Sequence, residues 1–164
     1  IFDNYYLICR RLFPRTGVLE LIKIIYLNKY FNKFNFIFTG NGPLFHELNK
    51  YKKNNIHILG NIDDKKLLNL KIHSLGTIIP SIEAEGYSVI AKEYILMKKN
   101  IFHTNQGGLK ESIVDYKLSY IFNINNHQTL IEKFKAANHD KKYLLKSDNI
   151  NKDDMFKKIN NLFK

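Results

Sequence analysis

The chain has one cysteine, Cys9, no tryptophan, and no stretch of about 18 or more apolar residues. A single cysteine excludes an intramolecular disulfide, and the lack of a long apolar stretch argues against a membrane-spanning helix. The six histidines are scattered without the spacing of metal ligands, so we expect no metal. These absences favour a cytoplasmic protein. Because the chain begins with Ile1, we take it for a fragment whose N-terminal part is missing.

Arginine is scarce as well, since the chain has 23 lysines but only three arginines. Arg10, Arg11 and Arg15 all lie in one short segment. A guanidinium group grips phosphate through two parallel hydrogen bonds, which an ammonium group cannot do. The cluster therefore predicts a diphosphate site, with a surface loop whose arginines are close by chance as the alternative.

The formal net charge of +11 is compatible with several anionic partners. No segment combines aromatic and basic residues as nucleic-acid-binding motifs do, so we expect no nucleic acid. An anionic membrane surface is a candidate partner, which would make the protein membrane-peripheral. The lysines are spread along the whole chain, however, and a solvated surface is the simpler interpretation.

Short apolar runs alternate with amphipathic segments along the chain. The runs typical of buried strands are residues 5–9, 35–39, 56–59, 77–79, 100–103 and 120–122. The segments typical of helices are residues 17–31, 43–52, 63–72, 88–97 and 109–114. The alternation predicts one α/β, Rossmann-like domain with a parallel sheet of about six strands and helices on both faces. A helical C-terminal tail of two or three helices is expected from residue 126.

Ligands of such folds bind at the carboxyl ends of the strands, where the arginine loop is expected to lie. Gly17 ends that loop and allows the backbone to approach a ligand closely. Gly40 and Gly42 follow the second strand, where a base or ribose could lie against the backbone, although a plain tight turn is equally compatible. Both glycines are therefore candidate binding residues.

A third loop follows the fourth strand and leads into a helix. The backbone amides of Gly86, Tyr87 and Ser88 are free to face a phosphate at the start of that helix. Glu85 is explained equally well as a helix cap. Glu93 lies where an apolar residue is expected, and a buried carboxylate needs donors such as ribose hydroxyls.

Six ordered segments resemble the group 1 (family 4) retaining glycosyltransferases. They are Arg10 to Gly17, Thr39 to Pro43, Leu59-Gly60, Pro80-Ser81, Glu85-Gly86-Tyr87 with Glu93, and Gly107-Gly108 with Glu111. The resemblance implies that residues 1–164 are the nucleotide-sugar (donor) domain of a two-domain enzyme of the GT-B fold whose N-terminal acceptor domain is absent. It implies a hexosyl-type transferase that moves a sugar, with retention, to a glycan or lipid-linked acceptor in surface polysaccharide synthesis.

The resemblance also implies roles for individual residues. Arg11 would hold the donor diphosphate, and Glu85 would lie near the hydroxyls of the sugar. Glu93 would accept the ribose hydroxyls, while the amides of residues 86–88 would meet the β-phosphate. No cofactor is implied, because the UDP- or GDP-linked sugar is itself the donor substrate.

Three residues depart from the family pattern. Thr16 stands where the family usually has Lys, and we expect Arg10 or Arg15 to replace that cation. Ser88 stands for the second glycine of the family motif, and Tyr94 for a small alanine. Thr16 and Ser88 favour an alternative, a degenerate module that binds a nucleotide sugar or scaffolds a complex without catalysis. A sugar-nucleotide epimerase of similar architecture is a third hypothesis.

Overall fold

The computed structural model describes residues 2–84, 86–139 and 158. Six strands form one sheet in the order β3-β2-β1-β4-β5-β6, and every neighbouring pair is parallel. The strands are β1 (Tyr5–Cys9), β2 (Asn35–Thr39), β3 (Ile56–Gly60), β4 (Gly76–Ile79), β5 (Asn100–His103) and β6 (Ser119–Ile121). The predicted α/β fold with about six parallel strands is confirmed.

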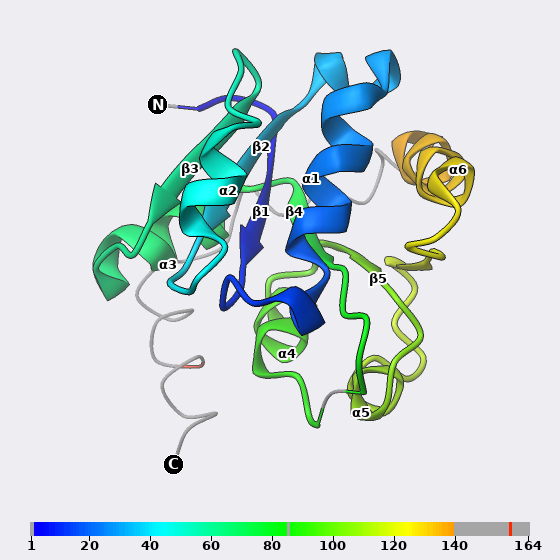
Figure 1. Ribbon diagram of the computed structural model, residues 1–164. Helices are drawn as coiled ribbons and strands as arrows, with labels where there is room; N and C mark the ends of the chain where they lie inside the picture. The colour runs from blue at the N-terminus through cyan, green and yellow to red at the C-terminus, as the bar shows by residue number, and fades with distance from the viewer. Residues whose placement is uncertain (1, 85, 140–157, 159–164) are drawn as a thin grey trace.

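The helices alternate with the strands along the chain (Figure 1). They are α1 (Val18–Leu27), α2 (Phe45–Asn49), α3 (Asp64–His73), α4 (Val89–Leu96), α5 (Gly108–Ser112) and α6 (His127–His139). Two 3-10 segments, η1 (Pro14–Thr16) and η2 (Lys29–Lys33), flank α1. α6 confirms the first helix of the predicted tail, and the rest of that tail lies outside the described residues.

Alternate strand residues pack on opposite faces of the sheet. Tyr6 and Ile8 belong to a large apolar cluster that includes residues of α1, α2, η2 and α6. Leu7 points to the other face, where residues of α3 pack against it, and a third cluster there joins α4 and α5 to β4 and β5. Helices therefore cover both faces, which explains why the strands are almost continuously apolar.

The predicted helix over residues 17–31 is wrong beyond residue 27. The side-chain amide of Asn28 donates to the Ile24 carbonyl at 2.7 Å, the carbonyl that a helical backbone N–H of Asn28 would use. The backbone of Asn28 is extended, with φ −102° and ψ 115°. α1 consequently ends, and the chain continues as η2. The helix expected over residues 43–52 is likewise shorter, since α2 has five residues.

The order in which strands are added across the sheet changes direction between β1 and β4, although the two strands are parallel. From β1 the chain first builds β2 and β3 on one side, and then crosses to build β4, β5 and β6 on the other. β1 and β4 are thus the neighbours at the topological switch point, where their outgoing loops diverge and leave a crevice. These two loops carry the predicted arginine cluster and the predicted helix-capping segment.

Candidate functional site

The loops after β1 and β4 are held together by backbone and side-chain contacts. The carbonyl oxygen of Arg15 accepts a hydrogen bond from the backbone N–H of Ile82 at 3.1 Å. The guanidinium of Arg10 donates to the Ser81 hydroxyl at 3.1 Å. Gly17 has φ +69°, and a Cβ on it would lie 1.9 Å from the Pro80 carbonyl oxygen. The two loops therefore form one joined wall at the switch point.

The contact of Gly17 with Pro80 gives this glycine a structural role, and its predicted contact with a ligand stays a prediction. Its missing side chain makes room for the backbone of the neighbouring loop. Gly17 also does not line either pocket at this edge of the sheet. It supports the site by fixing how closely the two loops approach.

Two pockets open at the carboxyl ends of β1, β2 and β4, and they share Cys9, Arg10 and Arg11. The first, which we call the arginine pocket, has a volume of about 460 Å³ and is also lined by Arg15, Thr16, Glu83, Ala84, Gly86 and Tyr87. The second, which we call the glycine pocket, has a volume of about 500 Å³ and is also lined by Phe13, Gly40, Asn41 and Gly42. The structure thus brings together seven of the predicted residues, namely Arg10, Arg11, Arg15, Gly40, Gly42, Gly86 and Tyr87.

The three guanidinium groups of the arginine pocket differ in their surroundings. Arg10 is half-buried, and burial lowers its pKa to about 10. Arg11 and Arg15 are exposed, and their side chains make no hydrogen bond or ion pair with the described residues. Glu83 is the only acidic side chain among the described residues that line the pocket. The pocket therefore has a surplus of positive charge, which suits a ligand with two phosphates.

Gly40 shapes the wall between the two loops of the glycine pocket. It has φ +132°, and a Cβ would lie 1.9 Å from the carbonyl oxygen of Arg10. The loops after β1 and β2 continue the sheet pairing there, because the Leu12 N–H donates to the Asn41 carbonyl at 2.8 Å. This close approach requires glycine. Gly40 and Gly42 are half-buried and Asn41 is exposed, and all three line the glycine pocket beside Arg10 and Arg11.

The start of α4 differs from the expectation at Ser88. Its backbone N–H, expected to face a phosphate, donates to the Ser112 hydroxyl at 2.9 Å, and the residue is 6% exposed. The Ser88 hydroxyl instead caps α4 by accepting from the Ala91 N–H. Ser88 is therefore a structural residue here. Gly86 and Tyr87 line the arginine pocket, and Tyr87 is 67% exposed with the Lys92 ammonium 5.2 Å from its ring centre.

Of the two predicted glutamates, the structure describes only Glu93. Glu85 lies outside the described residues. Glu93 is 4% exposed and lines neither pocket. Its carboxylate is bound by the ammonium of Lys71, at 2.9 Å from Oε1 and 2.7 Å from Oε2. The contact of Glu93 with a ribose stays a prediction. The hydrogen-bond donor that a buried carboxylate requires is supplied within the protein, by Lys71.

The pockets are also lined by Cys9, Phe13 and Asn41, which are not among the predicted site residues. Cys9 ends β1 and lines both pockets, and its position just before the arginines would have indicated this. Thr16 was noted only as a departure. Its hydroxyl lies within hydrogen-bonding distance of the carbonyls of Arg11 and Phe13, at 2.9 and 2.6 Å, so it closes the turn of η1.

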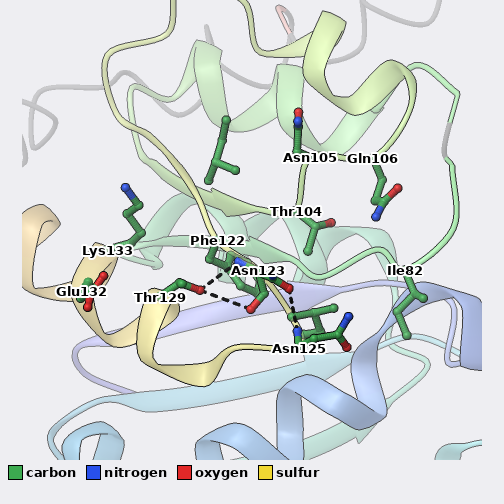
Figure 2. A pocket seen from close by; sticks show the side chains of 12 residues that line it. Ile82, Thr104, Asn105, Gln106, Phe122, Asn123, Asn125, Thr129, Glu132 and Lys133 are labelled. Carbon is green, nitrogen blue, oxygen red and sulfur yellow. Dashed lines mark hydrogen bonds between the residues drawn. The ribbon is translucent and has the colours of Figure 1, made fainter.

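A further pocket of about 550 Å³ lies at the carboxyl ends of β5 and β6 (Figure 2). The Asn123 N–H donates to the Thr129 hydroxyl at 2.9 Å, and the Asn125 N–H donates to the Asn123 side chain at 2.9 Å. These bonds shape the turn into α6 and use part of the polar lining. Lys133 is the only cation among the described residues that line this pocket. It is less suited to a diphosphate than the arginine pocket.

Among the described residues, no helix is long and apolar enough to cross a bilayer. No group of three or more His, Cys, Asp or Glu side chains gathers there as metal ligands would.

A doubly wound parallel sheet with a cleft at its switch point defines a Rossmann-like domain of the kind that forms one half of GT-B glycosyltransferases. The chain belongs to the family described as "Glycosyl transferases group 1", whose pattern matches residues 3–154. The resemblance recognised in the sequence is thereby confirmed.

Solved structures agree with this assignment. A glycosyltransferase from Rickettsia africae ESF-5 is 26% identical, with a TM-score of 0.70 over 82% of this chain and 37% of its own. Anabaena HepE, solved in complex with UDP, is 16% identical, with a TM-score of 0.71 over 98% and 48%. Sucrose-phosphate synthase from Thermosynechococcus elongatus is 14% identical, with a TM-score of 0.71 over 86% and 37%. A search among curated proteins found no match. The chain thus spans less than half the length of these structures.

Proposed function

We propose that this chain binds the nucleoside diphosphate of a UDP- or GDP-linked sugar in the joined arginine and glycine pockets. The diphosphate would lie against Arg10, Arg11 and Arg15, and the nucleoside against the backbone near Gly40 and Gly42. The observation that carries the proposal is the gathering of all three arginines of the chain around one pocket at the switch point. The complexes of HepE with UDP and of an E. coli trehalose-6-phosphate protein with UDP-2-fluoro glucose support it.

The catalytic contribution of the site would be electrostatic. As the sugar leaves, negative charge gathers on the diphosphate, and the fixed guanidinium groups stabilise it more strongly than they stabilise the donor. Arg11 would bear most of this role because its side chain is exposed toward the pocket and has no described partner. Glu85 would contact the hydroxyls of the sugar. Neither role requires a metal or another cofactor.

The whole protein would then be a hexosyl-type glycosyltransferase acting with retention. An N-terminal acceptor domain would hold a glycan or a lipid-linked acceptor, and the product would belong to a surface polysaccharide. Residues 1–164 would constitute the donor domain, which by itself would bind the donor but transfer the sugar weakly or not at all.

The proposal is tested by calorimetric titration of the chain with UDP, GDP and ADP. Saturable binding of one nucleotide is expected, with a loss of about 10- to 150-fold in Arg11→Ala, equivalent to about 1.5–3 kcal/mol for one charge-assisted interaction. Lys29→Ala is the matched control, because Lys29 is an exposed cation in η2, beyond the C-terminal end of α1. An equal loss of affinity in both variants would show that the loss comes from net charge alone. No binding of any nucleotide would contradict the proposal.

A degenerate module is the second candidate, and specific contacts favour it. The Ser88 amide is bound by Ser112, and the Glu93 carboxylate by Lys71, so fewer groups face a ligand than the family pattern suggests. Such a module would bind the nucleotide yet show no transfer when residues 1–164 form part of a two-domain protein. Donor hydrolysis or transfer by that longer protein distinguishes the two candidates.

We also propose a cytoplasmic protein that contacts an anionic membrane surface peripherally, for which the net charge of +11 is the supporting observation. Sedimentation with vesicles tests this contact. Binding is expected to vesicles that contain phosphatidylserine but not to pure phosphatidylcholine, and to weaken as salt is added. Equal sedimentation with both kinds of vesicle would contradict the electrostatic account.

A further inference from the structure

The pocket at the carboxyl ends of β5 and β6, which we call the amide pocket, adjoins the arginine pocket across the loop after β4. Ile82 lines the amide pocket, whereas the next two residues, Glu83 and Ala84, line the arginine pocket. The volume of the amide pocket, about 550 Å³, is typical of small-molecule sites. The two pockets are therefore neighbours with separate linings.

Neutral amide side chains provide most of the polar lining of the amide pocket. The described lining residues that carry one are Asn105, Gln106, Asn123 and Asn125. The side-chain amides of Gln106 and Asn125 make no hydrogen bond with any described residue. Figure 2 shows Gln106 entering from above and Asn125 from below. A side-chain amide offers N–H donors beside a carbonyl acceptor, and neighbouring hydroxyl groups of a sugar ring need both.

The charges that line the amide pocket cancel. Glu132 and Lys133 are the only charged side chains among the described residues that line it. The arginine pocket, by contrast, is lined by three guanidinium groups and the carboxylate of Glu83. A phosphate is therefore favoured in the arginine pocket, whereas the amide pocket suits a neutral polar ligand.

The amide pocket also has exposed apolar side chains. Ile82 is 38% exposed and Ile121 is 47% exposed, and both line the pocket. Covering such side chains is favourable, and the C–H face of a sugar ring can cover them while its hydroxyls bind amides. Phe122, the only aromatic residue among the described lining residues, is 3% exposed. The pocket consequently lacks the aromatic surface on which a nucleobase usually stacks.

Hydrogen bonds within the protein fix the walls of the amide pocket. The Thr104 hydroxyl, after β5, donates to the Ser81 carbonyl, after β4, at 2.6 Å. The backbone N–H of Asn125 donates to the side-chain oxygen of Asn123 at 2.9 Å. These bonds hold the three loops in place and leave the amides of Gln106 and Asn125 to a ligand, so little ordering is required on binding.

We propose that the amide pocket is a carbohydrate subsite that holds one neutral sugar ring. Gln106 and Asn125 bind ring hydroxyls, and Ile82 and Ile121 cover the apolar face of the ring. This inference goes beyond the proposed function, because the subsite requires no nucleotide. In the proposed enzyme, the subsite would hold one sugar unit of a glycan acceptor beside the cleft that binds the donor.

The test is binding of simple glycosides to the chain in solution. The probes are the methyl glycosides of glucose, galactose, mannose, N-acetylglucosamine and rhamnose, with glycerol and adenosine as comparison compounds. Nuclear magnetic resonance titration of ¹⁵N-labelled protein measures affinity and locates the contact. At least one glycoside is expected to bind with a dissociation constant on the order of 1–10 mM. It should shift the amide signals of residues 104–106 and 121–125 but not those of residues 10–17.

Two substitutions test the amide side chains. Gln106→Ala and Asn125→Ala should each weaken glycoside binding about 2- to 10-fold, and the double variant at least about tenfold. Both variants should fold, because neither amide has a described partner; circular dichroism checks this. Asn54→Ala is the matched control, since Asn54 is an exposed asparagine before β3 that does not line the amide pocket, and it should bind as wild type does.

Each alternative result has a definite meaning. The inference is overturned if no glycoside binds, if glycerol binds as tightly, or if the folded double variant keeps the wild-type affinity. It is also overturned if adenosine binds the same residues more tightly than any glycoside.

Arg11→Ala separates this inference from the proposed function. This variant should lose nucleotide affinity and keep glycoside affinity, because Arg11 lines the arginine pocket and not the amide pocket. Loss of glycoside binding in Arg11→Ala would place the sugar in the arginine pocket and overturn the inference alone. A wild type that binds a glycoside in the amide pocket but no nucleotide would support the inference and contradict the proposed function.

Discussion

Gly86 lines the arginine pocket, and no contact with the described residues requires a glycine there. A Cβ added to Gly86 would meet no described atom within 4 Å. Alanine also lowers the conformational freedom of the unfolded chain, which stabilises a compatible site by about 0.4–1 kcal/mol. We therefore expect Gly86→Ala to melt at the wild-type temperature or about 1–4 °C higher.

The same substitution should damage ligand binding. If the diphosphate lies against the Gly86 amide, a methyl group on the adjacent Cα enters the space that the phosphate uses. Loss of one hydrogen bond to a charged group corresponds to about 1.5–3 kcal/mol. We expect the affinity for the nucleotide to fall at least about tenfold. Calorimetric titration measures the affinity, and differential scanning calorimetry measures the melting temperature.

Gly40→Ala is the matched control within the same site. Gly40 has φ +132°, and its Cβ would lie 1.9 Å from the carbonyl oxygen of Arg10. Backbone strain of about 1–3 kcal/mol is expected, so this variant should melt several degrees lower. The two variants together distinguish a glycine that the fold requires from a glycine that the ligand requires.

Two results would refute this reasoning. If Gly86→Ala bound the nucleotide as tightly as wild type, the diphosphate would not approach the Gly86 backbone. If Gly86→Ala destabilised the protein as much as Gly40→Ala, the open space around the Gly86 Cβ would not describe the protein in solution.

Three further predictions concern Cys9, Arg10 and Tyr94. Cys9 is the only cysteine in the sequence and lines both pockets, so a bound nucleotide should slow its alkylation by iodoacetamide severalfold. Mass spectrometry follows the reaction. An unchanged rate would place the nucleotide elsewhere. Burial lowers the pKa of Arg10 to about 10, and a diphosphate favours the charged form, so the affinity for the nucleotide should fall as the pH rises through about 10. Arg10→Gln should reduce this dependence on pH. Titrations measure the affinity, and circular dichroism checks that the protein stays folded. Tyr94 is fully buried, so Tyr94→Ala should lower the free energy of unfolding by about 3–5 kcal/mol. Tyr94→Phe loses only the contact with Ser74 and should lower it by about 1 kcal/mol. Chemical denaturation measures both changes.

The strands could be predicted well because each is a short, mainly apolar run, and the central strands β1, β2, β4 and β5 are buried almost completely on both faces. The bounds of the helices were less predictable. Asn28 fits an amphipathic pattern as well as any polar residue does, but its side chain bonds the Ile24 carbonyl at the point where α1 ends. No sequence pattern distinguishes an asparagine that makes this bond from one that faces solvent.

The same distinction applies to the site. Residues that follow the strands were located correctly, because the carboxyl ends of parallel strands meet at one edge of a sheet. The partners of Ser88 and Glu93 could not be foreseen. Ser112 and Lys71 lie on other helices, 24 and 22 residues away, and their contacts arise only when those helices pack. An apolar helix face with one carboxylate indicated a missing donor but did not show whether the donor was a ligand or a lysine.

The three departures from the family pattern have structural explanations in this chain. Thr16 closes η1 with its hydroxyl, Ser88 caps α4, and Tyr94 fills the space between α3 and α4 with its hydroxyl 3.1 Å from that of Ser74. A domain that had merely lost its ligand would have no reason to keep exposed charge in the cleft. Arg11 and Arg15 nevertheless remain exposed around the arginine pocket without described partners, beside a half-buried Arg10. Their positive charge offsets the cation missing at Thr16, and it is the strongest argument that the cleft still binds a diphosphate.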